Sequence, residues 1–381
     1  APAAADRGDP VTWDLYTASR IAAFRRCPRA HRFRYELGIQ TPSGPAAAFG
    51  TSAHHGLEGW YRSWQRGGDR LSAAFDVCNT VPDPIESIRL RAILAAYHAR
   101  WHALDWEVLA VEQEFSYWLG DIEFAGKIDA IIRERDTGRA FVVEHKSTVQ
   151  DTSAGSPYWA KLACDTQISI YTDAATFALD IPVHGAIYDV LKRPQHDLKL
   201  ATPEDQRGYT TGKGCKSCGG SAKAGEIQQG RGYTIVSMVT VEHVPCLDCA
   251  GTGWKCDKDG VPQAPRPYAN VRLADETLDE FEERLIADIA ARPDDFLHRG
   301  VIVRLDSELP RMRDELIEQV TLMRAATASG LAPPNHSACS MGREMCGYFA
   351  ACSGQADIND HHQFPRGAAH SELVQITNSA A

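Results

Sequence analysis

Long apolar runs are missing from this chain of 381 residues, and no stretch approaches the roughly 20 apolar residues that a membrane-spanning helix needs. Residues 1–9 carry no apolar segment typical of a signal peptide. No internal repeat is evident. We therefore expect a soluble, cytoplasmic protein that does not act at a membrane.

Basic residues are not in excess, because 40 Lys and Arg stand against 50 Asp and Glu and give a net charge of −10. This balance argues against a protein that coats nucleic acid over its whole surface. One local basic segment nevertheless exists, with arginines at Arg20, Arg25, Arg26, Arg29, Arg32 and Arg34. Such a run is usually the solvated face of a helix, but beside a phosphate-cleaving site it could guide a nucleic-acid backbone.

Eleven cysteines in a chain without a recognisable secretion signal point to metal binding and not to disulfides. Four of them form a Cys-x2-Cys…Cys-x2-Cys set with glycine-containing turns: Cys215, Cys218, Cys246 and Cys249. Four thiolates at this spacing suit tetrahedral Zn²⁺. We expect a structural zinc in an inserted lobe, which could also recruit a protein partner; the alternative is four unrelated cysteines.

A second cysteine set combines one early residue with three late ones: Cys27, Cys339, Cys346 and Cys352. Four thiolates could hold either a second zinc or an iron–sulfur cluster, and spacing does not choose between them. Either site would join the N-terminal helix to the C-terminal segment.

Three β-runs, at 108–118, 122–133 and 139–146, form the segment around which the chain is organised, and Asp136-Thr137-Gly138 predicts a turn between the last two. Asp129 lies within the second run, and Glu144 and Lys146 end the third on one face of the strand. Carboxylates from neighbouring strands would hold Mg²⁺ or Mn²⁺, and the lysine would orient or deprotonate a water that attacks a phosphodiester.

The alternative for this segment is a hairpin whose charged residues face solvent. The apolar run Phe141-Val142-Val143 favours the metal site, because an acid and a lysine at the end of a buried strand must be paired or metal-bound. His54, on a helix predicted over residues 50–65, faces inward with the apolar stripe of that helix. It is either a satisfied core residue or a further metal ligand.

Helices predicted at 17–37, 86–104, 158–179, 278–291 and 308–326, together with a strand at 183–191, complete an α/β fold with a mixed central sheet. Gln167 and Tyr171 share one face of the helix over 158–179. Composition divides the chain into an N-terminal extension (1–16), a core (17–201), a zinc-knuckle insertion (202–263), a helical region with the late cysteines (264–355) and a tail (356–381) that we expect to be partly disordered.

The motifs resemble the PD-(D/E)xK nuclease superfamily, specifically the RecB-like exonucleases with a four-cysteine iron–sulfur cluster, a group that includes CRISPR-associated, AddB-type and phage exonucleases. The resemblance covers roughly residues 15–195 and 330–355. It rests on segments 17–28, 50–54, 126–129, 144–146 and 167–171 and on the three late cysteines. The zinc-knuckle insertion is not part of the family core.

This resemblance implies a restriction-endonuclease-like core, and it implies that His54, Asp129, Glu144 and the backbone carbonyl of His145 hold the Mg²⁺ or Mn²⁺ ion. Lys146 would assist the attacking water, and Gln167 and Tyr171 would position the lysine or the strand. The late cysteines and Cys27 would hold a [4Fe-4S] cluster that staples a helical cap.

We therefore expect a bacterial or phage-encoded metal-dependent DNA exonuclease that acts on single-stranded ends, in recombination and repair, phage DNA processing or CRISPR adaptation. Arg20, Arg25, Arg26 and Arg29 are the candidates for DNA binding. Two alternatives stay open: a DNA-binding module on a nuclease fold that no longer cuts, and an adaptor that recruits a partner through its zinc knuckle.

Overall fold

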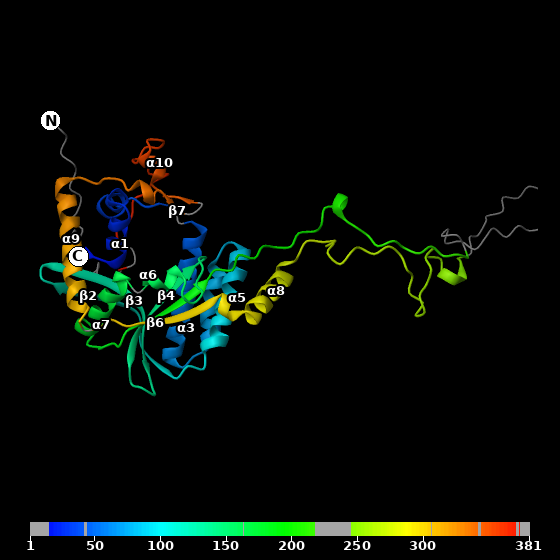
Figure 1. Ribbon diagram of the computed structural model, residues 1–381, viewed down its shortest axis with the longest axis horizontal. Coiled ribbons are helices and arrows are strands. Elements are labelled where there is room, and N and C mark those ends of the chain that lie inside the picture. Colours follow the sequence, from blue (N-terminus) through cyan, green and yellow to red (C-terminus); the bar gives the residue numbers. More distant parts are fainter. Residues whose placement is uncertain are drawn as a thin grey trace, which may run out of the picture. The chain divides into compact units, whose positions relative to one another are not determined.

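A six-stranded mixed sheet forms the centre of the computed structural model (Figure 1), which describes residues 15–41, 44–162, 164–217, 245–305, 307–341, 344–370 and 373. Its strands are β1 (Leu15–Tyr16), β2 (Trp106–Leu119), β3 (Ile122–Glu134), β4 (Ala140–Thr148), β5 (Ala186–Lys192) and β6 (Leu297–Ile302). A separate short hairpin pairs β7 (Ser340–Met341) with β8 (Glu344–Met345). The expected α/β fold with a mixed sheet is therefore confirmed.

The longest strand, β3, pairs with three others. It is antiparallel to β2 along its whole length, parallel to β1 at Glu123 and Phe124, and antiparallel to β4 only from Ala130 to Arg133. Beyond β4 the sheet continues with a parallel β5 and an antiparallel β6. The short β3–β4 pairing matters for the site described below, because the two strands separate in the middle of the sheet.

Helices cover both faces of the sheet (Figure 1). They are α1 (Ala18–Arg26), α2 (Pro28–His31), α3 (Pro45–Arg66), α4 (Arg70–Phe75), α5 (Pro84–Trp101), α6 (Pro157–Leu162), α7 (Thr166–Phe177), α8 (Leu278–Ala291), α9 (Leu309–Ser329) and α10 (Phe349–Cys352). The shorter turns are the π-helical η1 (Arg32–Glu36) and the 3-10 turns η2 (Asp76–Thr80), η3 (Glu204–Gln206), η4 (Leu247–Cys249), η5 (Pro293–Asp295) and η6 (His336–Ala338).

The core has apolar side chains on both sides of the sheet. Ile168 of α7 and Val320 of α9 pack with Phe115 and Ile128 on one face. On the other face, α3 packs against β4, and Tyr61 of α3 contacts the ring of His145. Burying large apolar side chains in this way supplies most of the free energy that stabilises a domain.

Prolines explain two differences from the predicted helices. The helix expected over 17–37 is divided into α1, α2 and η1, because Pro28 has no N–H to continue α1 and instead starts α2. Helix α3 begins at Pro45, five residues before the expected start, because proline is favoured in the first turn and alanines follow it. The short strand β6 was not predicted.

The chain divides into two compact units, residues 1–196 with 282–381 and residues 197–281. The first contains the six-stranded sheet, and the second spans the four paired cysteines, of which Cys215, Cys246 and Cys249 are among the described residues. Part of the segment expected to be a disordered tail packs in the first unit, where Phe364 is buried with Ile39 and Tyr348.

Candidate metal-dependent active site

Asp129 and Glu144 lie at the point where β3 and β4 stop pairing. The last backbone pair joins Ala130 to Val143. Asp129 is the residue before Ala130 and Glu144 is the residue after Val143, so both acids lie just beyond the end of the pairing. Asp129 Oδ2 accepts a hydrogen bond of 2.8 Å from the backbone N–H of His145. A carboxylate thus satisfies the buried amide that the interrupted β-ladder leaves without a strand partner.

A second group of contacts joins Glu144 to α7. Lys146 Nζ donates to Glu144 Oε1 at 2.6 Å and to Gln167 Oε1 at 2.7 Å. Gln167 Nε2 donates to Glu144 Oε1 at 2.9 Å and to the hydroxyl of Tyr171 at 2.7 Å. Asp165 caps the start of α7 by accepting from the backbone N–H of Gln167. The structure therefore brings together all four residues that the motifs had singled out here.

His54 reaches the same place from α3. Its Nδ1 lies 3.5 Å from Asp129 Oδ2. Burial by itself would lower the pKa of His54, but the charge and hydrogen bonding of Asp129 and the charge of Glu144 outweigh it and raise the pKa to about 9. Helix α3 can lie this close to β4 because Gly50 has no side chain; a Cβ there would meet Ser147 Oγ at 2.7 Å.

The donor set fits a hard divalent cation. Glu144 is buried, and its Oε2 has no hydrogen-bond partner among the described residues. Burial, opposed by Lys146 and reinforced by the charge of Asp129, raises the pKa of Glu144. The ligand atoms of Glu144, Asp129 and His54 do not all lie within 4.8 Å of one another, but the three groups are electrostatically coupled. Two carboxylates and an imidazole are ligands that Mg²⁺ and Mn²⁺ accept.

Behind the site lies a buried polar network that the sequence analysis did not find. Asp189 of β5 is 0% exposed and accepts from Tyr97 at 2.6 Å and from Arg299 of β6 at 2.8 Å. The ring of His145 packs beside it, with Nδ1 at 3.8 Å from Asp189 Oδ2. No motif spacing could reveal this network, because its members come from α5, β4, β5 and β6.

Glu112 of β2 was also given no role in the sequence analysis. It has a backbone φ of +51°, an unusual value for a residue with a side chain, and it forms an ion pair with Lys127 of β3. Burial raises the pKa of Glu112, Lys127 opposes that effect, and the charge of Asp129 adds to it. This carboxylate therefore lies close enough to Asp129 to affect its electrostatic surroundings.

The arginine segment is not uniformly exposed. Arg20 is buried, donates to the backbone oxygen of Leu15 at 2.6 Å and to His31 Nε2 at 3.3 Å, and stacks on Tyr16. A phosphate cannot reach such a side chain, so the expectation that Arg20 binds DNA is wrong. Arg25 and Arg26 are exposed and Arg29 is half-buried.

The N-terminal segment that carries Cys27 contacts the C-terminal segment that carries the late cysteines (Figure 1). Asn335 links them, because its backbone N–H donates to Cys27 Sγ at 3.4 Å and its side chain donates to the Arg26 carbonyl. Burial raises the pKa of Cys352, Arg29 lowers it, and the thiols of Cys346 and Cys27 raise it further. The backbone N–H of Cys346 donates to the Cys339 carbonyl at 2.7 Å.

In the unit formed by residues 197–281, Cys215, Cys246 and Cys249 are buried and have sulfur atoms that all lie within 4.8 Å of one another. Among the described residues this is the one group of three or more His, Cys, Asp or Glu side chains whose ligand atoms all lie within 4.8 Å of one another. Gly253 fits the turn with a φ of +78° and donates its N–H to Cys249 Sγ at 3.4 Å. Cys218, the fourth predicted ligand, lies outside the described residues.

Across the described part of the chain, no helix is long and apolar enough to cross a membrane. Comparison with known proteins gives one family match that spans most of the sequence: the model described as the PD-(D/E)XK nuclease superfamily matches residues 16–353. A search of curated proteins gave no match.

Two solved structures are similar over about half of the chain. The crystal structure of SSO0001 has 16% sequence identity and a TM-score of 0.23, over 47% of this chain and 63% of that one. A Eubacterium rectale protein, provisionally described as an exonuclease, has 10% identity and a TM-score of 0.34, over 48% of this chain and 70% of that one. The chain thus spans less than two thirds of the first of these structures.

Proposed function

Because the chain belongs to the PD-(D/E)XK nuclease superfamily, we propose that it is a Mg²⁺- or Mn²⁺-dependent deoxyribonuclease that hydrolyses phosphodiester bonds at single-stranded DNA ends. The observation that carries this proposal is the unpartnered buried Glu144 Oε2, on a carboxylate that bonds to Lys146 and is electrostatically coupled to the contacting pair of Asp129 and His54. Superfamily membership supports the divalent ion and the DNA substrate. The exonuclease activity and the preference for single strands are our inference.

His54, Asp129, Glu144 and the backbone carbonyl of His145 would hold the ion. When bound, the ion would stabilise the negative charge that develops on the phosphate during hydrolysis. The bond from the His145 N–H to Asp129 holds that carboxylate in place, so its orientation does not depend on a flexible rotamer.

Lys146 would hold and orient the attacking water. Its ammonium group has three N–H donors, and the bonds to Glu144 and Gln167 use two of them. The third can donate to a water or to a phosphate oxygen. Gln167 keeps Nζ in position, and Tyr171 in turn holds the amide of Gln167. These two residues therefore act as positioning residues for the lysine.

Arg25, Arg26 and Arg29 would guide the DNA backbone towards the site. Arg25 Nη1 donates to Thr166 Oγ1 at 2.5 Å, and Thr166 precedes Gln167 on α7. The arginine segment is thus anchored next to the residue that positions Lys146. Contacts of this kind supply affinity without reading sequence.

We also propose that Cys27, Cys339, Cys346 and Cys352 hold a [4Fe-4S] cluster. The ligands of a cluster bind different iron atoms, so their sulfurs lie farther apart than those around a single ion. Cys215, Cys218, Cys246 and Cys249 would hold one structural Zn²⁺. A reducing compartment such as the cytoplasm keeps these thiols available.

The test is digestion of end-labelled single-stranded DNA by anaerobically purified protein with Mn²⁺ or Mg²⁺. Glu144→Gln and Lys146→Ala should abolish cleavage. The matched control is Glu107→Gln at the start of β2, where Glu107 forms a half-exposed ion pair with Arg133, and this variant should cut like wild type. The visible spectrum and the iron and zinc content are recorded on the same sample. Absorption near roughly 400 nm would support the cluster.

Other outcomes would support the alternatives. Protein that binds DNA but cuts no substrate with either metal would be a binding module. If deleting residues 202–263 removed a protein partner while cleavage by the remaining chain persisted, the zinc knuckle would be an adaptor. That separation is plausible because these residues belong to a distinct compact unit.

A further inference from the structure

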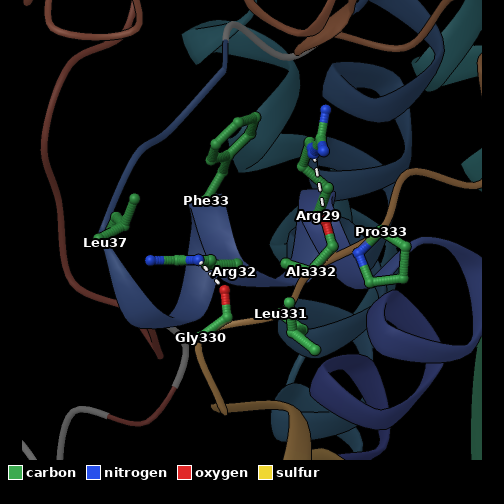
Figure 2. Close-up of a pocket in the computed structure, with 8 residues that line it drawn as sticks. All are labelled: Arg29, Arg32, Phe33, Leu37, Gly330, Leu331, Ala332 and Pro333. Carbon is green, nitrogen blue, oxygen red and sulfur yellow. Dashed lines mark hydrogen bonds between the residues drawn. The ribbon is translucent and has the colours of Figure 1, made fainter. Parts of the chain in front are cut away.

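A groove with a volume of about 580 Å³ lies between the arginine segment and the loop that follows α9. Figure 2 shows its lining, which comes from residues 29–37 on one side and residues 330–333 on the other. This groove involves none of the four residues around Glu144 and was not anticipated from the sequence.

One part of the lining is cationic. Arg29 Nε donates to the Ala332 carbonyl at 3.2 Å, and Arg32 Nη1 donates to the Gly330 carbonyl at 2.6 Å, as the dashed lines in Figure 2 mark. These bonds fix both guanidinium groups at the groove. A guanidinium has five N–H donors, so each retains donors beyond the bond to the loop carbonyl.

The other part of the lining is apolar and accessible. Leu331 is 69% exposed and Leu37 is 43% exposed, although both are large apolar side chains. Phe33 adds an aromatic ring, which also contacts Tyr348. Exposed apolar side chains that gather at one groove commonly mark a binding site.

We propose that this groove binds one unpaired nucleotide of the substrate strand. Its base would lie against Phe33, Leu37 and Leu331, and its phosphate would be bound by Arg29 and Arg32. The inference rests on the proposed function, which supplies single-stranded DNA as the ligand. Single strands are bound in this way elsewhere, by apolar or aromatic surfaces for the bases and basic side chains for the backbone.

Charge complementarity favours a nucleotide over an apolar peptide. The whole chain carries a net charge of −10, so two guanidinium groups at one apolar groove stand out against an acidic background. Arg32 also lies within ion-pair distance of Glu36, with 3.9 Å between Nε and Oε2. A peptide that only filled the apolar part would leave the guanidinium N–H donors that face the groove without an acceptor. A phosphate attached to a planar base satisfies both parts.

The position of the groove fits a substrate strand that continues to the catalytic residues. Cys27 and Pro28 connect Arg29 to α1, whose last turn carries Arg25. Arg25 bonds to Thr166, the neighbour of Gln167. Basic side chains therefore follow one another from the groove to the residue that positions Lys146.

The experiment measures the affinity of full-length protein for a labelled oligothymidylate by fluorescence anisotropy, in a Glu144→Gln background so that the strand stays intact. Arg32→Ala removes a phosphate contact and Leu331→Glu removes a base contact. Each should weaken binding roughly five- to tenfold. An abasic oligomer of the same length is measured in parallel. Leu331→Glu should weaken the abasic oligomer less, since it has no base to place against the leucine.

Matched variants on other surfaces control for loss of charge and of apolar area. Arg135→Ala, in the β3–β4 turn, and Leu322→Glu, on an exposed face of α9, should bind like the background protein. Affinities unchanged in Arg32→Ala and Leu331→Glu would overturn the proposal. If Leu331→Glu lost equal affinity for the normal and the abasic oligomer, the groove would bind only phosphate and the proposed base contact would be wrong.

Cleavage by the wild-type protein is followed separately. Protein that binds through the groove but cuts nothing would retain this inference while the proposed function fails. If the wild-type protein cuts DNA and the groove variants keep its DNA affinity, the proposed function holds and this inference fails. Wild-type protein that binds no DNA would overturn both.

Discussion

The backbone N–H of His145 donates to Asp129 Oδ2 at 2.8 Å, where β3 and β4 part. One carboxylate therefore has a structural task, satisfying a buried amide, and by our proposal a chemical task, binding a divalent ion. Substitutions can separate the two, because an amide side chain accepts a hydrogen bond almost as a carboxylate does but is a weaker ligand for a hard cation.

Asp129→Asn should leave the fold intact and abolish Mn²⁺ binding, as measured by isothermal titration and by thermal unfolding. Asp129→Leu should in addition lower the free energy of unfolding by about 1–3 kcal/mol, because the buried His145 N–H then has no acceptor. Equal stability of the two variants would contradict the structural role of Asp129.

Gln167→Ala should slow cleavage by about 10- to 100-fold while the affinity for DNA changes little. The substitution removes the bond from Lys146 to Gln167 and the bond from Gln167 to Glu144, so the ammonium group is no longer held in one position. Tyr171→Phe removes only the hydroxyl that accepts from Gln167 and should have a smaller effect. Single-turnover cleavage at saturating protein separates this loss from a loss of binding, and a Gln167→Ala protein that cuts at the wild-type rate would exclude a positioning role.

Asp189→Asn should lower the free energy of unfolding by about 3–5 kcal/mol in urea titrations, because it leaves the buried guanidinium of Arg299 without its counter-charge. Adding Arg299→Gln should recover part of that loss, since both charges are then absent. The pair of exposed Asp121 with half-buried Arg324 is the control, and Asp121→Asn should change the free energy of unfolding by no more than about 1 kcal/mol. A double variant less stable than Asp189→Asn would contradict this account.

The sequence motifs anticipated the residues around Glu144 because each is encoded locally: Asp129, Glu144 and Lys146 stand out as charged residues in apolar strands, and Gln167 and Tyr171 are spaced by one helical turn. The superfamily match confirms the broad part of the resemblance, and the iron–sulfur cluster stays a prediction. The prediction that Arg20 binds DNA was wrong, because a helical arginine gives no local sign that its guanidinium will turn inward to a backbone carbonyl. The pair of Asp189 and Arg299 could not be predicted, because these residues are 110 positions apart and meet only through sheet pairing.

Stability should fall on acidification through His31. Burial, aided by the charges of Arg20 and His370, lowers the pKa of His31 to about 3 from an ordinary value of 6.5. Between these values the unfolded chain binds the proton and the folded chain does not, so the free energy of unfolding falls as pH drops below 6.5, by up to about 1.4 kcal/mol per pH unit. His31→Gln should flatten this slope in urea titrations between pH 6.5 and 5, and a matched His102→Gln at the surface should not.

Zinc should be separable from cleavage. Cys246→Ser removes one of three buried thiolates whose sulfurs lie within 4.8 Å of one another, and a serine hydroxyl is a far weaker zinc ligand, so the zinc content measured by mass spectrometry should fall from about one per chain towards zero. Cys256→Ser is the matched control, because this half-buried cysteine stands outside that group and the protein should keep its zinc. Mn²⁺-dependent cleavage should persist in both variants, since the residues around Glu144 belong to the other compact unit. If Cys246→Ser kept its zinc, the ion would be held elsewhere; if it lost zinc and cleavage together, the zinc unit would be needed for the active site and not only for its own fold.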